Sequence, residues 1–254
     1  MITTFIAEQG GVGKTSLCFN LAWYLASQGK KILMIDLDAQ GSNLSFVTGM
    51  RDTSGISGIY EILMGEDKIE NCIYKITPNI SLIPANNNAK DISKVVEGKL
   101  NSDYTCLKTH INRIKNNYDY VFLDTNPTPS DIHIISLVAS DDLIIPLLPD
   151  AKSIEGTKHV LETYKGVKDA YNKDLEVKAL VYNKSENRTT LSKYVESEIK
   201  DIALTYNVPV AQTKIPQNVN IAETIIYNTG ITDYKETSKG AKGFFALSKE
   251  LFNI

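Results

Sequence analysis

A glycine-rich segment near the start of the chain constrains its fold more than any other feature. The residues from Glu8 to Thr15 read EQGGVGKT; they follow a short apolar run and open a helical pattern. The glycines let the backbone turn tightly and bring several N–H groups against phosphate oxygens. The helix that starts near Thr15 adds the partial positive charge of its N-terminus. Strand, loop and helix in this order predict a phosphate-binding loop.

In such a loop the polar side chains have defined tasks. The Lys14 ammonium would reach the β- and γ-phosphates of a nucleotide, and the Thr15 hydroxyl would bind Mg²⁺. A glycine-rich turn that binds no ligand is the alternative, and the motif positions of these two residues argue against it. The predicted nucleotide contacts are Gln9, Gly10, Gly11, Val12, Gly13, Lys14, Thr15 and Ser16.

Short apolar runs alternate with longer helical patterns along the whole chain. The runs are often β-branched, which is typical of buried strands in a parallel sheet. They lie at residues 2–7, 31–37, 80–84, 118–123, 143–148, 177–182 and 208–211. The clearest helical patterns lie at residues 15–27, 104–116, 153–170, 191–206 and 237–252. This alternation predicts a single α/β domain, residues 1–254, with a doubly wound, mostly parallel sheet and helices on both faces.

The composition excludes several classes of protein. The 27 basic and 30 acidic residues give a net charge of −3, so any nucleic-acid surface must be a local patch. Cys18, Cys72 and Cys106 lie far apart, which argues against a disulfide framework and fits a reducing compartment. No apolar run approaches the ~18 residues that span a membrane, and the first residues lack a signal-peptide pattern. We therefore expect a cytoplasmic protein without a membrane partner.

Acidic residues end two of the predicted strands. Asp36 and Asp38 face the same way at the carboxyl end of the second strand, beside the phosphate loop. A carboxylate there can hold Mg²⁺ through water, and a second one can position an attacking water. Asp124 ends the apolar run YVFLD and would reach the same Mg²⁺ shell.

Together these motifs resemble those of the ParA/MinD family of deviant P-loop ATPases. The GGxGKT spacing resembles the family's deviant Walker A motif, the segment DLDAQG that begins at Asp36 resembles its DxDPQG switch I motif, and the strand ending in Asp124 resembles its Walker B motif. The resemblance implies that Asp38 positions the attacking water, with Lys14 as the second catalytic residue. It also implies that Thr15, Asp36 and Asp124 form the metal site.

The chain departs from the family's motifs at three positions. Gln9 stands where the family has a signature lysine that crosses the dimer interface to the partner's phosphates. A neutral amide can donate a hydrogen bond there but brings no charge. Ala39 replaces a proline of the switch I motif, and Asn126 replaces a proline in the DTPP segment that follows the Walker B strand. The first departure concerns hydrolysis and dimerisation more than ATP binding.

The resemblance continues almost to the end of the chain. Asn183 closes a predicted strand where the family places an asparagine against adenine, and residues 215–219 (IPQNV) resemble its IPxNV loop beside the base. Pro216 and Asn218 are therefore implied as further nucleotide contacts. Residues 233–241 resemble the family's late DxxSKGA segment. The resemblance implies the deviant P-loop NTPase fold, with ATP and Mg²⁺ as cofactors.

The family resemblance implies a DNA or plasmid partition ATPase. Such a protein forms an ATP-dependent homodimer, binds DNA without sequence preference and is stimulated by a ParB-like partner. Candidate DNA contacts are basic residues of the C-terminal half, namely Lys184, Arg188, Lys193, Lys235, Lys239 and Lys242.

A second hypothesis makes the chain a catalytically weak switch or cargo-positioning protein. Gln9 motivates this hypothesis, because the charge expected at its position is missing. ATP would then hold a conformation that a protein partner recognises, with slow or absent turnover. The residues leave both hypotheses open.

Overall fold

A seven-stranded sheet organises the protein. The computed structural model describes residues 1–38, 44–86, 103–185 and 189–254. The strands are β1 (Ile2–Phe5), β2 (Ile32–Asp36), β3 (Tyr74–Lys75), β4 (Ile80–Ile83), β5 (Tyr120–Asp124), β6 (Asp142–Leu147) and β7 (Glu176–Tyr182). Their order across the sheet is β3-β4-β2-β5-β1-β6-β7. All pairings are parallel except that of the two-residue edge strand β3 with β4.

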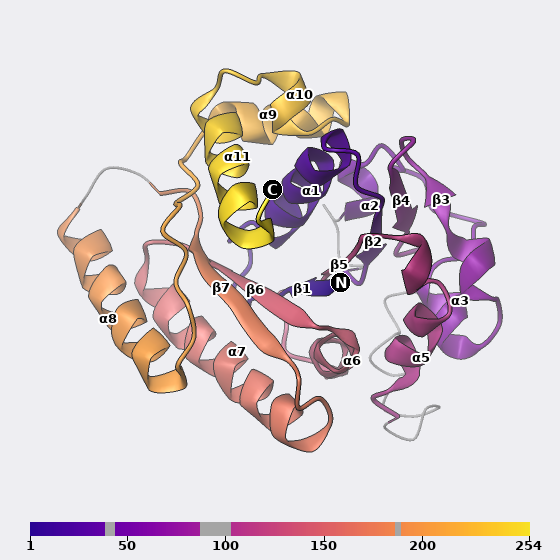
Figure 1. The fold of residues 1–254 in the computed structure, drawn as a ribbon, viewed down its shortest axis with the longest axis horizontal. Helices are drawn as coiled ribbons and strands as arrows, with labels where there is room; N and C mark the ends of the chain where they lie inside the picture. Colours follow the sequence, from indigo (N-terminus) through magenta and orange to yellow (C-terminus); the bar gives the residue numbers. More distant parts are fainter. Residues whose placement is uncertain (39–43, 87–102, 186–188) are drawn as a thin grey trace.

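Helices cover both faces of this sheet, so the predicted doubly wound α/β fold is confirmed. Figure 1 shows α1 with α9, α10 and α11 on one side of the strands and α6, α7 and α8 on the other. The helices are α1 (Lys14–Ser27), α2 (Leu44–Val47), α3 (Ile59–Met64), α5 (Cys106–Asn112), α6 (Asp131–Ala139), α7 (Ala151–Ala170), α8 (Thr190–Tyr206), α9 (Val219–Tyr227), α10 (Ile231–Tyr234) and α11 (Lys239–Phe252), with 3₁₀ turns at Ile69–Cys72 and Lys115–Asn117.

The side chains of the central strands divide between the two faces because successive residues of a strand point to opposite sides. In β5, Phe122 packs with α1 and α11, whereas Val121 and Leu123 pack with α3, α5 and α6. All three side chains are fully or almost fully buried. Burial on both faces explains why these strands read as continuous apolar runs in the sequence.

The structure corrects one predicted strand. Residues 208–211 form a single isolated bridge, between Val210 and Leu180, instead of a strand. Pro209 lacks an N–H group, so this segment cannot extend a ladder of hydrogen bonds along β7. The sequence patterns also missed the two-residue strand β3 and the short helices α2, α3, α6, α9 and α10.

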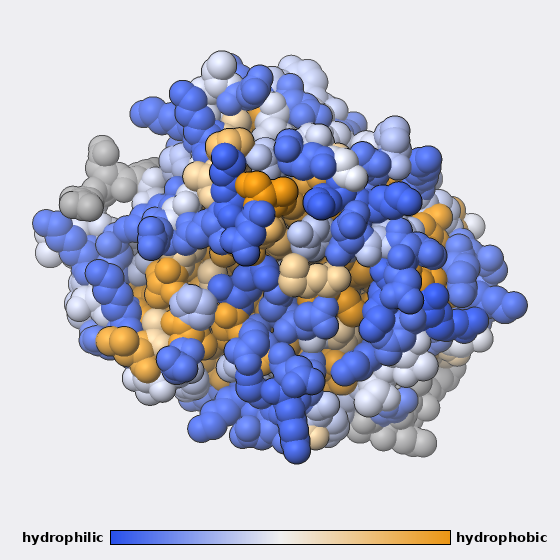
Figure 2. Space-filling view, viewed as in Figure 1, coloured by the Kyte–Doolittle hydropathy of each residue, from blue (hydrophilic) through white to orange (hydrophobic). Residues whose placement is uncertain are grey.

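The surface shown in Figure 2 is mostly hydrophilic, with apolar side chains in separate groups. The large apolar side chains with most exposure lie on α8 and α9, where Leu204 is 78% exposed and Val219 is 68% exposed. None of the described helices is both long enough and apolar enough to span a bilayer.

Two hydrogen bonds join α10 to α1. The Ile231 N–H donates to Asn20 Oδ1 at 2.8 Å, and the Trp23 indole N–H donates to Asp233 Oδ2 at 2.6 Å. Gly230 allows this approach, since a Cβ atom there would lie 2.4 Å from Trp23 Cγ. The backbone of Gly230 has a φ of −70°, which any residue adopts, so only the space requires glycine.

We therefore expect Gly230→Ala to destabilise the protein by about 1–3 kcal/mol, the usual cost of overpacking. Gly166→Ala is the matched control, because a Cβ atom at this position in α7 meets nothing within 4 Å. Alanine is the better helix former, and this control should gain about 0.5–1 kcal/mol. Denaturant unfolding of both variants measures these changes; a Gly230→Ala variant as stable as the native protein would contradict the packing argument.

Candidate nucleotide-binding site

The predicted site residues meet at the carboxyl ends of the parallel strands. The phosphate loop joins β1 to α1, Asp36 ends β2, Asp124 ends β5 and Asn183 follows β7. Asp124 pairs in register with Phe5 of β1 on one side and with Asp36 on the other. In open α/β sheets, this edge is where ligands bind.

Two glycines give the phosphate loop its shape. Gly11 and Gly13 have φ values of 74° and 95°, in the left-handed region that favours glycine. A Cβ atom on Gly13 would also lie 2.0 Å from Asn183 Nδ2. The loop therefore passes so close to the residue after β7 that Gly13 is required for both conformation and space.

Lys14 begins α1 beneath this loop. Its side chain is buried, and Nζ donates to the Ala7 carbonyl at 3.3 Å. Burial lowers the pKa of Lys14, and the nearby negative charges of Asp124 and Asp38 act against that shift. The ammonium and both carboxylates therefore lie within electrostatic reach of one another, as a phosphate-transfer site requires.

Thr15 and Asp124 are joined directly: Thr15 Oγ1 donates to Asp124 Oδ2 at 2.7 Å. The other carboxylate oxygen, Oδ1, is buried and has no hydrogen-bond partner among the described residues. An oxygen left in this condition is costly unless a ligand satisfies it. A hydroxyl beside a carboxylate oxygen that lacks a partner is an oxygen donor set that suits Mg²⁺, so the residues present fit the predicted metal.

Asp36 is fully buried and is bound within its own chain. Oδ2 accepts from Ser45 N at 2.7 Å and from Ser45 Oγ at 2.6 Å, while Oδ1 accepts from Asp38 N at 3.1 Å. Its predicted contact with the metal stays a prediction. The described residues contain no group of three or more His, Cys, Asp or Glu able to hold a metal ion. Mg²⁺ would thus depend on Thr15, few carboxylates and nucleotide phosphates, as in other phosphate-transfer sites.

Burial shifts the pKa of both strand-end carboxylates upward. Desolvation, followed by the charge of Asp124, raises the pKa of Asp36 to about 8. Desolvation raises the pKa of Asp124 to about 7, against the lowering effects of the Thr15 hydrogen bond and of Lys14. Asp38 is half-buried at the edge of the site, and residues 39–43, including Ala39, lie outside the described residues.

Gln9 does not point freely into solvent. Its Nε2 donates to Asp150 Oδ2 at 2.9 Å, and its Oε1 accepts from Ser153 Oγ at 2.9 Å. Asp150 is also the N-cap of α7, since its Oδ1 accepts from Ser153 N at 3.0 Å. Both polar atoms of the Gln9 side chain are thus bound by the start of α7, and a lysine could not accept the Ser153 bond.

Glu8 makes a further contact with α7 that the sequence did not indicate. Its side chain is 9% exposed, and Oε2 lies 3.3 Å from His159 Nδ1. A void of only about 10 Å³ remains between the loop and this helix. The N-cap pattern at Asp150 and Ser153 predicts where α7 begins, but no sequence pattern indicates that this helix contacts Glu8 and Gln9.

Asn183 and Lys184 hold the loop from the opposite side. Asn183 Nδ2 donates to the Val12 carbonyl at 2.7 Å, and Lys184 Nζ donates to the Gly11 carbonyl at 2.8 Å. Asn183 Oδ1 accepts from Lys184 N at 2.9 Å. Both polar atoms of the Asn183 amide are therefore used within the chain, and its contact with adenine stays a prediction.

The other predicted base contacts follow in the segment before α9. Pro216 forms an isolated parallel β-bridge with Ser185. Asn218 is the N-cap of α9, and its Oδ1 accepts from Asn220 N at 2.9 Å. Asn126 lies beyond the tip of β5 with Oδ1 buried and without a partner among the described residues. Its carbonyl lies 2.9 Å from His133 Nε2, so α6 fixes the backbone after the Walker B strand.

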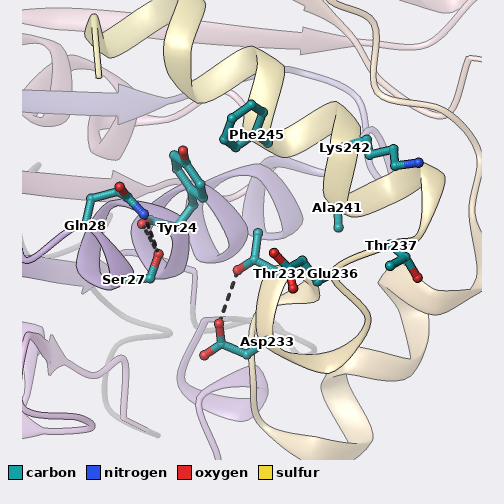
Figure 3. A pocket seen from close by; sticks show the side chains of 10 residues that line it. All are labelled: Tyr24, Ser27, Gln28, Thr232, Asp233, Glu236, Thr237, Ala241, Lys242 and Phe245. Carbon is teal, nitrogen blue, oxygen red and sulfur yellow. Dashed lines mark hydrogen bonds between the residues drawn. The ribbon is translucent and has the colours of Figure 1, made fainter.

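The predicted DNA contacts are spread over several elements. Lys193 lies on α8, whereas Lys235, Lys239 and Lys242 are exposed around α10 and α11, in a separate part of Figure 1. Arg188 lies outside the described residues. Lys242 lines a hollow of about 820 Å³ that also holds acidic side chains, and its ammonium points away from them in Figure 3. The lining residues are Tyr24, Ser27, Gln28, Thr232, Asp233, Glu236, Thr237, Ala241, Lys242 and Phe245.

The fold and the phosphate loop define a P-loop nucleotide-binding protein of the α/β class. A family profile described as an AAA domain matches residues 1–177. The chromosome-partitioning ATPase Soj of Treponema pallidum is 30% identical over 250 residues, which cover 97% of this chain and 95% of that protein. The sporulation initiation inhibitor protein Soj of Bacillus subtilis is 30% identical over 245 residues, 96% and 95% of the two chains. This chain belongs to the ParA-type family of P-loop ATPases, as the motifs predicted.

Solved structures share the fold. Cobyrinic acid a,c-diamide synthase from Mycobacterium smegmatis, with a bound ATP analogue and magnesium, superposes with a TM-score of 0.81 at 24% identity and covers 98% of this chain and 92% of its own. The septum site-determining protein MinD from Pyrococcus horikoshii, complexed with Mg-ADP, gives 0.76 at 23% identity, with coverages of 99% and 95%. At these identities the likeness concerns the fold alone. The predicted cofactors, ATP and Mg²⁺, agree with the ligands of these neighbours.

The two raised carboxylate pKa values predict a pH-dependent stability in the absence of Mg²⁺ and nucleotide. Between the unfolded pKa of about 3.9 and the folded values near 7 and 8, the folded state binds more protons than the unfolded state. Stability should therefore fall as the pH rises from about 4 to about 8. Asp124→Asn removes one of these groups and should be more stable than the native protein at pH 8, by about 2 kcal/mol.

Unfolding measured in urea at pH 5 and pH 8 tests this prediction. Asp201→Asn, at an exposed position of α8, serves as the control and should leave the pH dependence unchanged. If the free energy of unfolding depends on pH identically in the native protein and in Asp124→Asn, ionising the buried Asp124 carboxyl does not destabilise the fold.

Proposed function

We propose that residues 1–254 form one ATPase domain that binds and hydrolyses ATP in a DNA or plasmid partition cycle. The observation that carries the proposal is the cluster of Lys14, Thr15 and Asp124 under a phosphate loop whose glycines adopt the required conformations. The name of the Treponema pallidum relative, a chromosome-partitioning ATPase, supports the partition role. The buried, free cysteines fit the cytoplasmic location that the sequence predicts.

Each residue of the cluster has a task in this proposal. The loop N–H groups and the start of α1 bind the phosphates, and the Lys14 ammonium offsets their charge. Thr15 and Asp124 hold Mg²⁺, which would neutralise charge on the terminal phosphates. Asp38 orients the attacking water, while Asp36 holds the backbone of Asp38 by accepting its N–H.

The roles of Lys14 and Asp38 can be separated by experiment. Asp38→Ala should still bind ATP but release phosphate at least ~100-fold more slowly, because it loses only water positioning. Lys14→Ala should lose ATP binding as well as turnover. Nucleotide binding by fluorescent-analogue titration, combined with steady-state phosphate release, measures both properties. Native phosphate release no faster than that of Lys14→Ala would reject the hydrolysis step.

The partition role requires a DNA-binding form and a second copy of the chain. We propose that the ATP-bound chain dimerises, binds DNA without sequence preference and is released by a ParB-like protein. The exposed lysines that follow α10 and lie in α11 support a phosphate-binding patch, although Asp233 and Glu236 nearby reduce its net charge.

The DNA-binding proposal predicts a specific dependence on salt. The ATP-bound native protein should bind random-sequence duplex DNA, with an affinity that falls by about 0.9 log units per log unit of salt for each neutralised phosphate. Replacing Lys235, Lys239 and Lys242 by alanine should reduce this slope. Lys75→Ala, on the edge strand β3, is the control and should not. Light scattering on the same samples reports the dimer; absent or salt-independent binding would overturn the proposal.

A second candidate function is favoured by the contacts of Gln9. Because its amide is bound by Asp150 and Ser153 of the same chain, it is not free to reach a second copy in this conformation. The protein would then be an ATP-controlled switch, or a cargo-positioning protein, that a partner recognises. The phosphate-release measurement above decides between the two, since turnover well above the Lys14→Ala control rules out the switch without turnover.

A further inference from the structure

Lys184 has an unusual backbone conformation. Its φ is 50°, in the left-handed region, where side chains with a Cβ atom are disfavoured. The other non-glycine residues with positive φ in the described part of the chain are Asn207, Asn228 and Asn253, and each of these asparagines is the C-cap of a helix. Asparagine tolerates this conformation better than lysine does. A lysine in such a position calls for a reason in its side chain.

The side chain of Lys184 reaches the phosphate loop. Nζ donates to the Gly11 carbonyl at 2.8 Å, at the exposed rim of the loop. Asn183, its neighbour in sequence, donates to the next carbonyl, that of Val12. Two consecutive residues after β7 therefore hold two consecutive carbonyls of the loop.

These contacts fix the direction of the loop's N–H groups. In a planar trans peptide the carbonyl and the following N–H point in opposite directions. With the Gly11 and Val12 carbonyls turned toward residues 183 and 184, the N–H groups of Val12 and Gly13 point away from them. These are the groups that a phosphate loop presents to a nucleotide.

Lys184 also changes the charge of the site. Residue 9 is a neutral glutamine held against α7, so it contributes no positive charge to the loop. Lys14 lies buried beneath the loop, and the Lys184 ammonium lies at its rim. Only one of the three donors of that ammonium is used by Gly11, which leaves others for solvent or a ligand.

We propose that Lys184 is a positioning residue of the phosphate loop: it holds the Gly11 carbonyl outward and supplies beside the phosphates the positive charge that Gln9 lacks. The inference rests on the proposed binding of ATP. It gives Lys184 a role other than the DNA contact that the sequence predicts, and this role needs no DNA and no second copy of the chain.

The test compares variants by their affinity for ADP and for a non-hydrolysable ATP analogue. Titrations with Mg²⁺, without DNA and at low protein concentration, isolate the single chain. Asparagine suits the left-handed backbone at this position, so Lys184→Asn should fold with unchanged or higher thermal stability. The variant removes the positive charge, and its shorter side chain cannot reach the Gly11 carbonyl. It should therefore lose affinity for the ATP analogue about tenfold (~1.4 kcal/mol). Its loss for ADP should be smaller, because ADP carries less negative charge.

Two further variants separate charge from packing. Lys184→Arg keeps the charge and should bind within about threefold of the native protein. Lys200→Asn, at an exposed position of α8 to which no role is assigned, should bind as the native protein does. Gln9→Lys combined with Lys184→Asn should recover part of the lost affinity, because it returns a positive charge to the loop.

The outcomes distinguish this inference from the proposed function. If the native protein binds neither nucleotide, ATP binding itself is wrong and the inference falls with it. If the native protein binds both and Lys184→Asn binds equally well, only the role of Lys184 is overturned. Equal losses in Lys184→Asn and Lys184→Arg would likewise overturn the role assigned to the charge.

Discussion

Two carboxylates, Asp36 and Asp124, are buried side by side at the tips of the neighbouring strands β2 and β5. They pair in register, and exclusion of water raises the pKa of both carboxyl groups. The charge of Asp124 raises the pKa of Asp36 further. The surrounding groups offset part of the free-energy cost of burying these carboxylates. Ser45 donates twice to Asp36, Thr15 donates to Asp124, and Lys14 is placed within electrostatic reach. One oxygen of Asp124 remains without a partner among the described residues, and this observation supports the proposed metal site.

The phosphate loop sits above these carboxylates and is held from two sides. On one side, Glu8 and Gln9 contact α7. On the other, Asn183 and Lys184 hold the carbonyls of Val12 and Gly11. Such support matters because a loop preorganised for phosphate needs no reordering when the ligand arrives. The helix α7 follows β6 along the chain, and residues 183 and 184 follow β7, the neighbour of β6 in the sheet. The order of strands in the sheet therefore determines which residues support the loop.

The C-terminal helices stabilise the same site at a distance. Asn20 of α1 accepts from the N–H of Ile231, the first residue of α10, and donates to the Ser16 carbonyl. The Trp23 indole N–H donates to Asp233. The helix whose first turn carries Lys14 and Thr15 is therefore fixed along its length by residues more than 200 positions away. This arrangement gives the late segment of the family motif a structural task in addition to any contact with DNA.

The sequence by itself determined the phosphate loop, the acidic residues at the strand ends and the alternation of the main strands and helices along the chain. These features depend on local requirements, such as glycine at positive φ in the loop and continuous apolar runs in β2 and β5, and the residues themselves display them. Short elements escaped prediction: α9 reads as a β-branched run, and residues 208–211 resemble a strand although Pro209 prevents one. Their conformations depend on which neighbours are available for hydrogen bonding and packing.

Only the tertiary structure decided what Gln9, Asn183 and Lys184 do. The partners of Gln9 are 141 and 144 residues away in sequence, and Lys184 is 173 residues from Gly11. No local pattern encodes such pairs, because a side chain's partner is chosen by the packing of the whole sheet. The sequence showed that a lysine was missing at position 9. The fold brought the amide at that position to α7 and another lysine to the rim of the loop, since the carboxyl ends of parallel strands converge at one edge.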